Sequence, residues 1–495
     1  MSCTVYRIDV EDLDFLGMLG GRQGVGTPWL DEANHRILFV WTAVTTLAGQ
    51  AETPTFPNHN KGVFFRAFDY ESETFSPASS AIPVSVNTGI ISTVGSVDAV
   101  GFMYDDVLND MVVVFGDTLG LVMCSSQDGG ATWSAQTTLL TDGGGSWCYS
   151  DSAMNPYSRD MFVWAWHAVG GSQINDIRLY KRTNTGMAPN TTWVRALGGS
   201  LFFDGGAVAN INTSNISRFN HSKMMASTDA STMVAVFDVT NADNTCVLKA
   251  FWTTDNWDTM NTTDITATFP AVGGHRGPVF MSPEVLKDPT SNRVWCVWMQ
   301  VEGSNILPHY AYTDDCGQTW TLVGYAPVQD NPNWDEAFDR GAFLDYAGRM
   351  YESEFYASGL TNVHNAWRTS DPTDLSSWVS DECNLDLVTT YTVLSSTEGF
   401  TFYVLLPDGT TTKFLRCFGR GWPVVPPSTH NVQTYDLFVK TEFVPPPPPP
   451  PPPPAPDEHR MFRRGVLQAS PVGIPQRNAS AVRSIEEAVR PPGVN

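Results

Sequence analysis

The sequence has little positive charge and no segment typical of membrane or secreted proteins. It carries 29 Lys and Arg against 52 Asp and Glu, for a formal charge of −23 at pH 7. This charge repels phosphates and anionic lipids, so we expect no nucleic-acid partner. No apolar run approaches about 18 residues, and no basic n-region precedes an apolar stretch at the N-terminus. We therefore expect neither membrane insertion nor secretion through a signal peptide.

The sequence also lacks the short motifs of cofactor and metal chemistry. It contains no G-x-x-x-x-G-K-[ST], no G-x-S-x-G and no dinucleotide fingerprint. His221 and His275 do not have the spacing of metal ligands. The eight Cys form no C-x-x-C pair and lie mostly in apolar runs, which indicates buried thiols, with disulfides or metal ligation as the alternatives. We expect no cofactor and no transition-metal site.

Short runs of aromatic and β-branched residues recur along the chain. Seven of them begin at residues 36, 111, 161, 233, 293, 350 and 400. Each follows a turn rich in Asp, Asn, Gly, Ser or Pro, which is typical of a β-hairpin. The starts are on average about 60 residues apart, which is enough for one four-stranded antiparallel sheet. We expect each run to be the second strand of its sheet.

One turn sequence appears twice in phase with these runs. The copies share a hydroxyl, a carboxylate, a glycine and a tryptophan: Ser126, Asp128, Gly130 and Trp133 in the first, and Thr313, Asp315, Gly317 and Trp320 in the second. Degraded copies occupy 68–75, 253–260 and 370–378. The motif resembles the Asp box, or BNR repeat, of sialidase-like β-propellers.

This resemblance implies an all-β propeller of four-stranded antiparallel blades. The seven runs favour seven blades, although sialidases have six. In that family the motif joins the third and fourth strands of a blade, on the face opposite the active site. Asp128 and Asp315 are therefore expected to be structural. The propeller would span residues 1–443, and residues 434–440 would supply the closing strand.

The chain beyond the propeller changes composition. Residues 444–456 contain ten consecutive prolines, which predict a stiff polyproline linker, with a docking motif as the alternative. Residues 457–495 carry six Arg and four acidic residues. They predict a C-terminal anchor peptide with a short helix near 480–490, and a solvated charge run is the alternative.

Candidate site residues come from the expected face opposite the motif turns. Sialidases hold a carboxylate with three Arg and use a Tyr–Glu nucleophile pair with an Asp acid, because planar guanidinium groups match a carboxylate. The catalytic candidates are Asp98, Tyr351 and Glu352, with Glu354 as an alternative to Glu352. The ligand-binding candidates are Arg22, Asp151, Arg276, Asp339, Arg340, Trp29 and Trp334. Arg218, His221, His275 and Trp147 are expected on the same face. A structural salt bridge is the alternative for each Arg, and core packing is the alternative for each Trp.

The family's Arg-Ile-Pro signature is absent, and the nearest sequence is Arg7-Ile8-Asp9. We therefore favour binding without catalysis. The expected function is that of a virion structural or attachment protein, in the manner of a tailed phage. Its propeller head would bind a cell-surface glycan or receptor, and its tail would contact other virion proteins in a larger assembly formed in the host cytoplasm. The alternatives are a sialidase-like hydrolase of acidic glycans and a non-enzymatic assembly or scaffold propeller.

Overall fold

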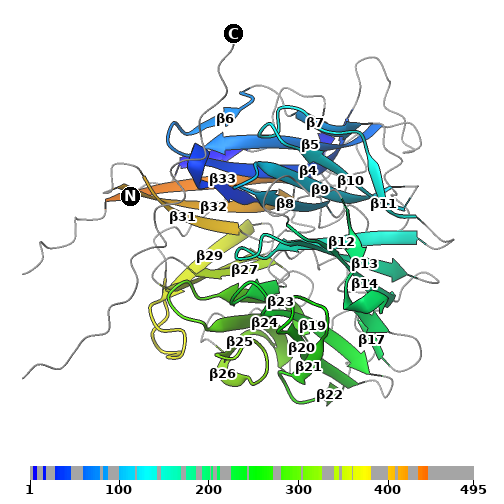
Figure 1. Cartoon of the computed structure of the whole chain (residues 1–495). Coiled ribbons are helices and arrows are strands. Elements are labelled where there is room, and N and C mark those ends of the chain that lie inside the picture. The colour runs from blue at the N-terminus through cyan, green and yellow to red at the C-terminus, as the bar shows by residue number, and fades with distance from the viewer. Residues whose placement is uncertain are drawn as a thin grey trace, which may run out of the picture. The chain divides into compact units, whose positions relative to one another are not determined.

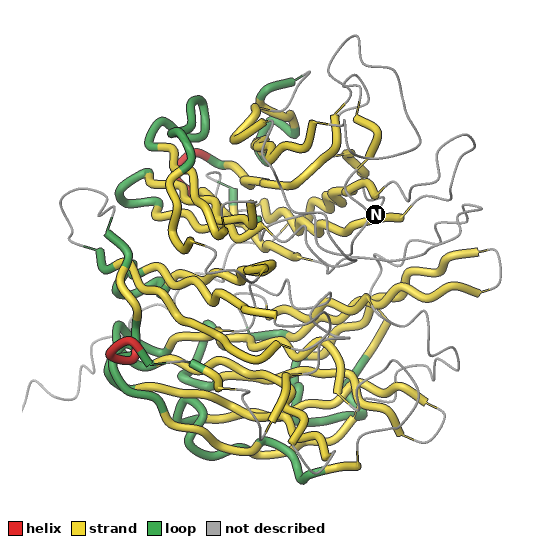
Figure 2. Tube along the Cα trace, turned by 90° about the vertical axis from the view of Figure 1, so that its right-hand side faces the viewer, coloured by secondary structure: helices red, strands yellow, loops and turns green. Residues whose placement is uncertain are grey.

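The described part of the chain is built almost entirely of β-strands. The computed structural model describes residues 4–7, 15–17, 28–45, 60–78, 82–86, 100–117, 120–141, 146–168, 174–184, 192–200, 202–204, 209–211, 225–241, 245–270, 280–302, 305–325, 339–344, 348–358, 361–380, 400–406, 411–421 and 433–443. Figure 2 shows strands throughout this trace. Helix appears in it as two 3₁₀ turns, η1 (Glu32–Asn34) and η3 (Leu197–Gly199).

The strands pair antiparallel, mostly in chain order (Figure 1). The first sheet contains β2 (Phe15–Gly17), β3 (Trp29–Asp31), β4 (Arg36–Thr45), β5 (Asn60–Asp69), β6 (Thr74–Ser76) and β7 (Ile82–Val86). The second contains β8 (Val100–Asp105), β9 (Asp110–Asp117), β10 (Gly120–Ser126) and β11 (Thr137–Thr141).

An eleven-stranded sheet follows. It contains β12 (Ser146–Met154), β13 (Met161–Ala168), β14 (Ile174–Arg182), β15 (Val194–Arg195), β16 (Phe203–Asp204), β17 (Ala209–Ile211), β18 (Met225–Ser227), β19 (Met233–Asn241), β20 (Thr245–Thr253), β21 (Asn261–Asp264) and β22 (Phe269–Pro270). β17 joins an array around β12–β16 to one around β18–β22. The number of blades therefore stays a prediction.

Three four-stranded sheets complete the described part. They contain β23 (Phe280–Lys287), β24 (Val294–Glu302), β25 (Asn305–Thr313) and β26 (Thr321–Tyr325); β27 (Asp339–Leu344), β28 (Met350–Ser358), β29 (Thr361–Thr369) and β30 (Val379–Ser380); and β31 (Phe400–Leu405), β32 (Thr411–Gly421), β33 (Gln433–Phe443) and β1 (Thr4–Arg7).

Buried side chains fill the spaces between successive arrays of strands, including the two arrays that β17 joins. Phe65 of β5 meets Phe102 of β8, with ring centroids 6.5 Å apart. Trp164 of β13 lies 6.4 Å from Trp257, which follows β20. Burying an aromatic side chain of this size contributes on the order of 1.5–3 kcal/mol. Sheets stacked face to face in sequence order are the arrangement of a propeller, and the predicted all-β propeller fold is confirmed.

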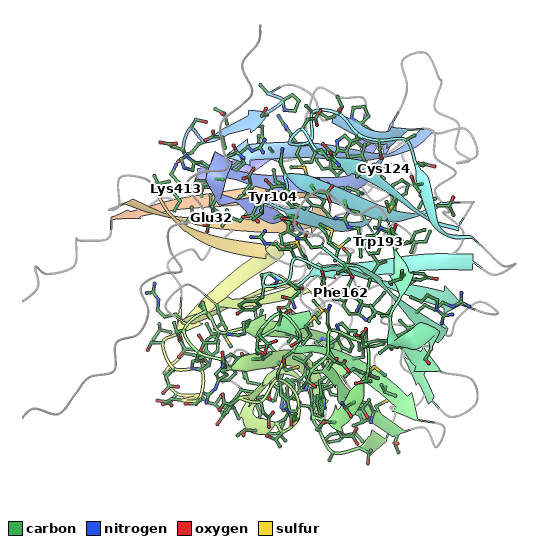
Figure 3. The ribbon with its side chains drawn as sticks, viewed as in Figure 1. Glu32, Tyr104, Cys124, Phe162, Trp193 and Lys413 are labelled. Atoms are coloured by element: carbon green, nitrogen blue, oxygen red, sulfur yellow. The ribbon has the colours of Figure 1, made fainter. Side chains whose placement is uncertain are left out.

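The two ends of the propeller sequence meet in one sheet. β33 lies between β32 and the N-terminal β1, in the register Tyr6 to Leu437. Lys413 of β32 also donates to the carboxylate of Glu73 in the first sheet, at 2.7 Å, and Figure 3 labels this lysine. The closing strand predicted at 434–440 thus lies within β33.

The prediction about the second strands needs one correction. The runs in β4, β9, β13, β19, β24 and β28 each pair on both sides, whereas β31 lies at an edge of its sheet. The run at 400 is therefore not a second strand in the described sheet. β1 takes a place in that sheet, so the run at 400 needs only two later strands to complete a set of four.

Hairpins and motif turns lie at the same end of the strands. In the β23–β26 sheet, Val294 pairs with both Lys287 and Thr313, so the hairpin 288–293 and the turn 314–320 are neighbours. Arg293 and Asp314 form an ion pair there at 2.7 Å. We call this end, with its hairpins and the turns 126–133, 253–260 and 313–320, the motif face.

Chain contacts group Met1–Pro445 into one compact unit. The polyproline linker and the anchor peptide lie outside the described residues, and their boundaries stay predictions. Among the described residues, no helix has the length and apolar character needed to cross a membrane.

Candidate functional site

Asp128 organises the first motif turn. Its Oδ1 accepts hydrogen bonds from the Ser126 hydroxyl at 2.8 Å and from the Thr132 N–H at 2.9 Å. Its Oδ2 accepts from the Thr132 hydroxyl at 2.6 Å. The Trp133 indole donates to the carbonyl of Gly130 at 3.1 Å, and its ring packs against Phe65 with centroids 5.6 Å apart. Both carboxylate oxygens of Asp128 therefore act within the turn.

Asp315 makes the same contacts in the second motif turn. It accepts from the Thr313 hydroxyl at 2.7 Å, the Thr319 N–H at 2.8 Å and the Thr319 hydroxyl at 2.7 Å. The Trp320 indole donates to the Gly317 carbonyl at 3.2 Å. The two copies found in the sequence are therefore one structure, and the shared residue types follow from its hydrogen bonds.

These hydrogen bonds hold the carboxylates in the ionised form. The Thr132 hydroxyl and N–H, with the Ser126 hydroxyl, lower the pKa of Asp128 to about 2. Partial burial raises the pKa of Asp315, but the hydrogen bonds from Thr319 and Thr313 together outweigh it and the net pKa is lowered. A general acid for glycoside cleavage needs a raised pKa. Neither carboxyl group suits that role.

The glycines of the two turns are required by close packing. Gly130 has φ +88°, and a Cβ there would lie 2.2 Å from Cε1 of Phe65. Gly317 has φ +101°, and its Cβ would lie 2.8 Å from Cγ2 of Val234. Both neighbours belong to the preceding sheet. Glycine thus serves both the left-handed backbone and the contact between sheets.

Among the degraded copies, residues 253–260 form the same hydrogen-bonded turn. Asp255 accepts from the Thr253 hydroxyl at 2.7 Å, the Thr259 N–H at 2.8 Å and the Thr259 hydroxyl at 2.6 Å. Trp257 takes the position of the glycine, with φ +63°, and is fully buried against Trp164. In contrast, Asp69 and Asp371 receive N–H groups only two or three residues ahead, as in ordinary Asx turns.

Trp29 is half-buried and packs against the core. Its indole N–H donates to the carbonyl of Phe102 at 2.6 Å, and its ring packs against two core clusters. Its partner across the sheet is Leu38, close to the hairpin at η1. This placement agrees with the core-packing alternative and argues against stacking on a sugar.

Several candidates lie on strands β27 and β28 at the end opposite the motif face. Asp339 is opposite Phe355, and Arg340 is opposite Glu354. Leu344 and Met350 close this strand pair at its other end. The strand register therefore places the backbone positions of Arg340 and Glu354 opposite each other, which the sequence alone did not predict.

Tyr351 and Glu352 occupy consecutive positions of β28. The register with β27 and with β29 runs without a shift through both residues. Consecutive positions of a regular strand belong to opposite faces of the sheet. The uninterrupted pairing therefore argues against Tyr351 and Glu352 as a nucleophile pair, since a bulge would be needed to bring them together.

Glu284 is a buried carboxylate that sequence reasoning missed. It is 2% exposed, and its Oε2 accepts from the N–H of Ala342 on the neighbouring β27 at 2.8 Å. The pairing of β23 with β24 shifts between Met281 and Glu284. The sequence signal for this residue was a Glu directly after Pro283 and before the apolar Val285 and Leu286, because a buried charge requires a partner. Glu284 connects two successive sheets.

Some of the remaining candidates lie on described strands, and the rest lie outside the described residues. Asp151 and Trp147 lie on β12, paired with Trp164 and His167. Arg7 lies on β1, paired with Asp436. The candidates outside the described residues are Asp98, Arg22, Arg276, Trp334, Arg218, His221 and His275.

Four cysteines whose side chains the structure describes are free and buried: Cys124, Cys246, Cys296 and Cys316. Burial raises the pKa of the Cys124 thiol to about 11. Burial, with a smaller contribution from Glu284, raises the pKa of Cys296 well above its usual value. Neutral buried thiols are poor nucleophiles and poor metal ligands. In the described ranges, no three His, Cys, Asp or Glu side chains gather as a metal site would require.

The chain matches no protein-family description and no curated protein. Among solved structures it is similar to the polysaccharide lyase Uly1, with TM-score 0.44, 7% identity and coverage of 88% of this chain and 99% of that chain. It is similar to the α-L-arabinofuranosidase Arb93A from Fusarium graminearum, with TM-score 0.40, 12% identity and coverage of 68% and 91%. It is also similar to an N11 neuraminidase-like protein of influenza virus A/flat-faced bat/Peru/033/2010, with TM-score 0.38, 9% identity and coverage of 88% and 93%. These similarities are weak, and the fold assignment rests on the strand order and register described above.

Proposed function

We propose that this chain is a glycan- or receptor-binding propeller whose recognition surface lies opposite the motif face. The observation that carries the proposal is the register of β27 and β28, which sets Arg340 opposite Glu354 with Asp339 beside them. An arginine bordered by carboxylates can hold an acidic sugar through its guanidinium while the carboxylates accept hydroxyl groups.

The motif face is a poorer candidate for this recognition. The carboxylates of Asp128, Asp255 and Asp315 accept hydrogen bonds within their own turns. Arg293 is bound by both oxygens of Asp314, at 2.7 and 2.9 Å. Groups already satisfied by internal partners gain little from a ligand. The opposite end of the strands is therefore the better site.

Binding without bond cleavage is the form of the proposal that the register favours. Tyr351 and Glu352 are adjacent on a regular strand, so this pair does not supply an activated tyrosine nucleophile. A protein that retains glycans needs only complementary polar groups and a ring-stacking surface. We infer that Arg340 and its paired Glu354 orient the ligand.

A glycan-cleaving enzyme is the second candidate, and Glu284 is the observation that favours it. Its carboxylate reaches the N–H of Ala342 at 2.8 Å, and Ala342 lies opposite Glu352. Glu284 on β23 and Glu352 on β28 both adjoin β27, and two carboxyl groups are the minimum set for glycoside hydrolysis. The substrate in this case would be an acidic glycan.

We further propose that the propeller is mounted on a virion through residues 457–495. The support is compositional: ten prolines separate a strongly acidic body from a tail with six Arg and four acidic residues. A stiff spacer keeps the head away from the surface that holds the tail. Deleting residues 457–495 should abolish incorporation into particles while the head still folds. Normal incorporation of the deleted chain would contradict this part of the proposal.

The binding proposal is tested on an array of sialylated and neutral glycans, with retained protein and released sugar measured in the same wells. We expect retention on acidic glycans without release, and loss of retention in Arg340→Ala and in Arg276→Ala. The matched control is Arg293→Ala on the motif face, which should bind like the wild type. Release that disappears in Glu284→Gln or Glu352→Gln would establish the enzyme instead. Neither retention nor release would favour the scaffold role.

A further inference from the structure

Four hairpins on the motif face share one turn geometry. In each, a side-chain oxygen accepts the N–H of the residue two positions ahead: Asp105 from Val107 at 3.0 Å, Asn155 from Tyr157 at 2.8 Å, Asp229 from Ser231 at 2.7 Å, and Asp288 from Thr290 at 2.7 Å. The geometry places no demand on the side chain of the residue that donates, so that side chain can be polar without loss of the turn.

Two of these hairpins carry apolar or aromatic side chains where the other two carry hydroxyls. Val107 is 70% exposed and Tyr157 is 53% exposed. Ser231 and Thr290 occupy the same turn position in their hairpins. Large apolar side chains that face water contribute little to folding, and together on one surface they mark sites of protein contact.

Val107 and Tyr157 belong to adjoining hairpins. Arg159 follows Tyr157, and its guanidinium forms ion pairs with Asp105 and Asp106, beside Val107. The Asn184 side chain also donates to Asp105 at 3.2 Å. These bonds fix the two hairpins against each other. We call the surface formed by Val107, Tyr157 and Asp106 the hairpin patch.

The surroundings of the hairpin patch expose negative charge. Asp106 is 48% exposed and Asp258 is 73% exposed, whereas their partners Arg159 and Lys181 are 24% and 11% exposed. Lys181 on β14 also donates to the carbonyl of Asn256, in the turn 253–260, at 3.0 Å. Arg159 and Lys181 are thus mostly buried in ion pairs, whereas the carboxylates of Asp106 and Asp258 are exposed to solvent. A partner for this surface should be basic.

We propose that the hairpin patch docks a basic partner protein that offers apolar side chains between its Arg or Lys residues. Val107 and Tyr157 would be buried at the centre of the contact, and Asp106 and Asp258 would pair with the partner's cations at its rim. This site lies at the end of the sheets opposite the proposed glycan surface. One head could therefore hold a glycan and a protein at the same time.

The test uses two synthetic peptide probes with the full chain: one alternating Arg and Leu, and one alternating Arg and Ser. We expect the Arg/Leu peptide to bind more tightly than the Arg/Ser peptide. The double variant Val107→Ser with Tyr157→Ser should bind the Arg/Leu peptide at least tenfold more weakly, and its melting temperature should be unchanged because both side chains are exposed. Thr290→Ser, at the matched turn position, should bind like the wild type.

Two further measurements, of the salt dependence of binding and of self-association, can contradict the proposal. Asp106→Asn with Asp258→Asn should reduce the salt dependence of binding. Equal affinity for both peptides, equal binding by the double variant, or no binding of the Arg/Leu peptide to the wild type would overturn the proposal. Sedimentation of the chain alone tests whether a second copy of this chain occupies the hairpin patch. If the wild type self-associates and the double variant does not, the patch binds a second copy, and the basic partner is ruled out.

Discussion

The turns 126–133 and 253–260 hold their carboxylates in the same way but fill the space behind them differently. In the first, Gly130 lets the backbone lie against Phe65, and Trp133 covers that ring from the end of the turn. In the second, Trp257 enters the space itself, and Met260 stands where the other turn has Trp133. The hydrogen bonds define the turn, and the volume next to it decides between glycine and tryptophan.

This difference explains why the motif occurs in the sequence as both full and degraded copies. Asp128 and Asp255 are fixed by contacts made within a few residues, so their spacing appears in the sequence. The fifth residue of the motif packs against the preceding array of strands, so its identity depends on side chains far away in the chain, such as Phe65 or Trp164. Sequence variation is therefore expected at the fifth position of the motif and not at its hydroxyl and carboxylate positions.

The largest expected effect is at Trp257. Trp257→Ala should destabilise the protein by about 4 kcal/mol, because truncating a fully buried Trp leaves a cavity. Trp257→Gly should be less damaging by about 1 kcal/mol although it removes more atoms, since glycine tolerates φ +63° better than alanine. Denaturant unfolding of the three proteins checks this order. If the glycine variant is the less stable of the two, the backbone explanation fails.

The next effect tests the close approach at the first turn. Gly130→Ala should cost about 3 kcal/mol, because its Cβ would overlap Phe65 and its φ is left-handed. Gly198→Ala is the matched control, with φ +60° and no atom within 4 Å of the new Cβ, and should cost about 1 kcal/mol. Thermal melts of the two variants measure the difference. Equal losses would show that packing against Phe65 is unimportant.

A smaller effect is expected at the tryptophan that closes the turn. Trp133→Met copies Met260 of the turn 253–260 and removes the ring contact with Phe65 and the indole bond to Gly130. The expected loss is about 1–2 kcal/mol. Met260→Trp is the reverse exchange and should gain nothing, because Trp257 already fills that space. A gain in melting temperature for Met260→Trp would contradict this account.

The smallest effect is a pH dependence at Asp128. Its folded pKa of about 2 lies below the ordinary value. The ionised carboxylate therefore adds stability above about pH 4, and this stability is lost as the pH falls towards 2. Asp128→Asn should flatten the decline in melting temperature between pH 4 and pH 2. An unchanged slope would show that the turn does not depend on the charge.

The sequence predicted local features of this fold better than those made by distant contacts. The carboxylates of the two motif turns and six of the seven second strands follow from turn chemistry and strand periodicity. The edge position of β31 depends on β1, which comes from the other end of the chain. The contact of Glu284 with Ala342 depends on the packing of two sheets, and the pairing of Arg340 with Glu354 depends on sheet register. Spacing within one strand contains no information about such partners.

The central claim is that the motif face builds the propeller and the opposite ends of the strands recognise the ligand. The most direct test measures retention on an acidic glycan array by three folded proteins: the wild type, Arg340→Ala, and Asp128→Asn combined with Asp315→Asn. The account predicts that the double variant binds like the wild type although it is less stable, and that Arg340→Ala does not bind. Loss of binding in the double variant with full binding by Arg340→Ala would contradict it.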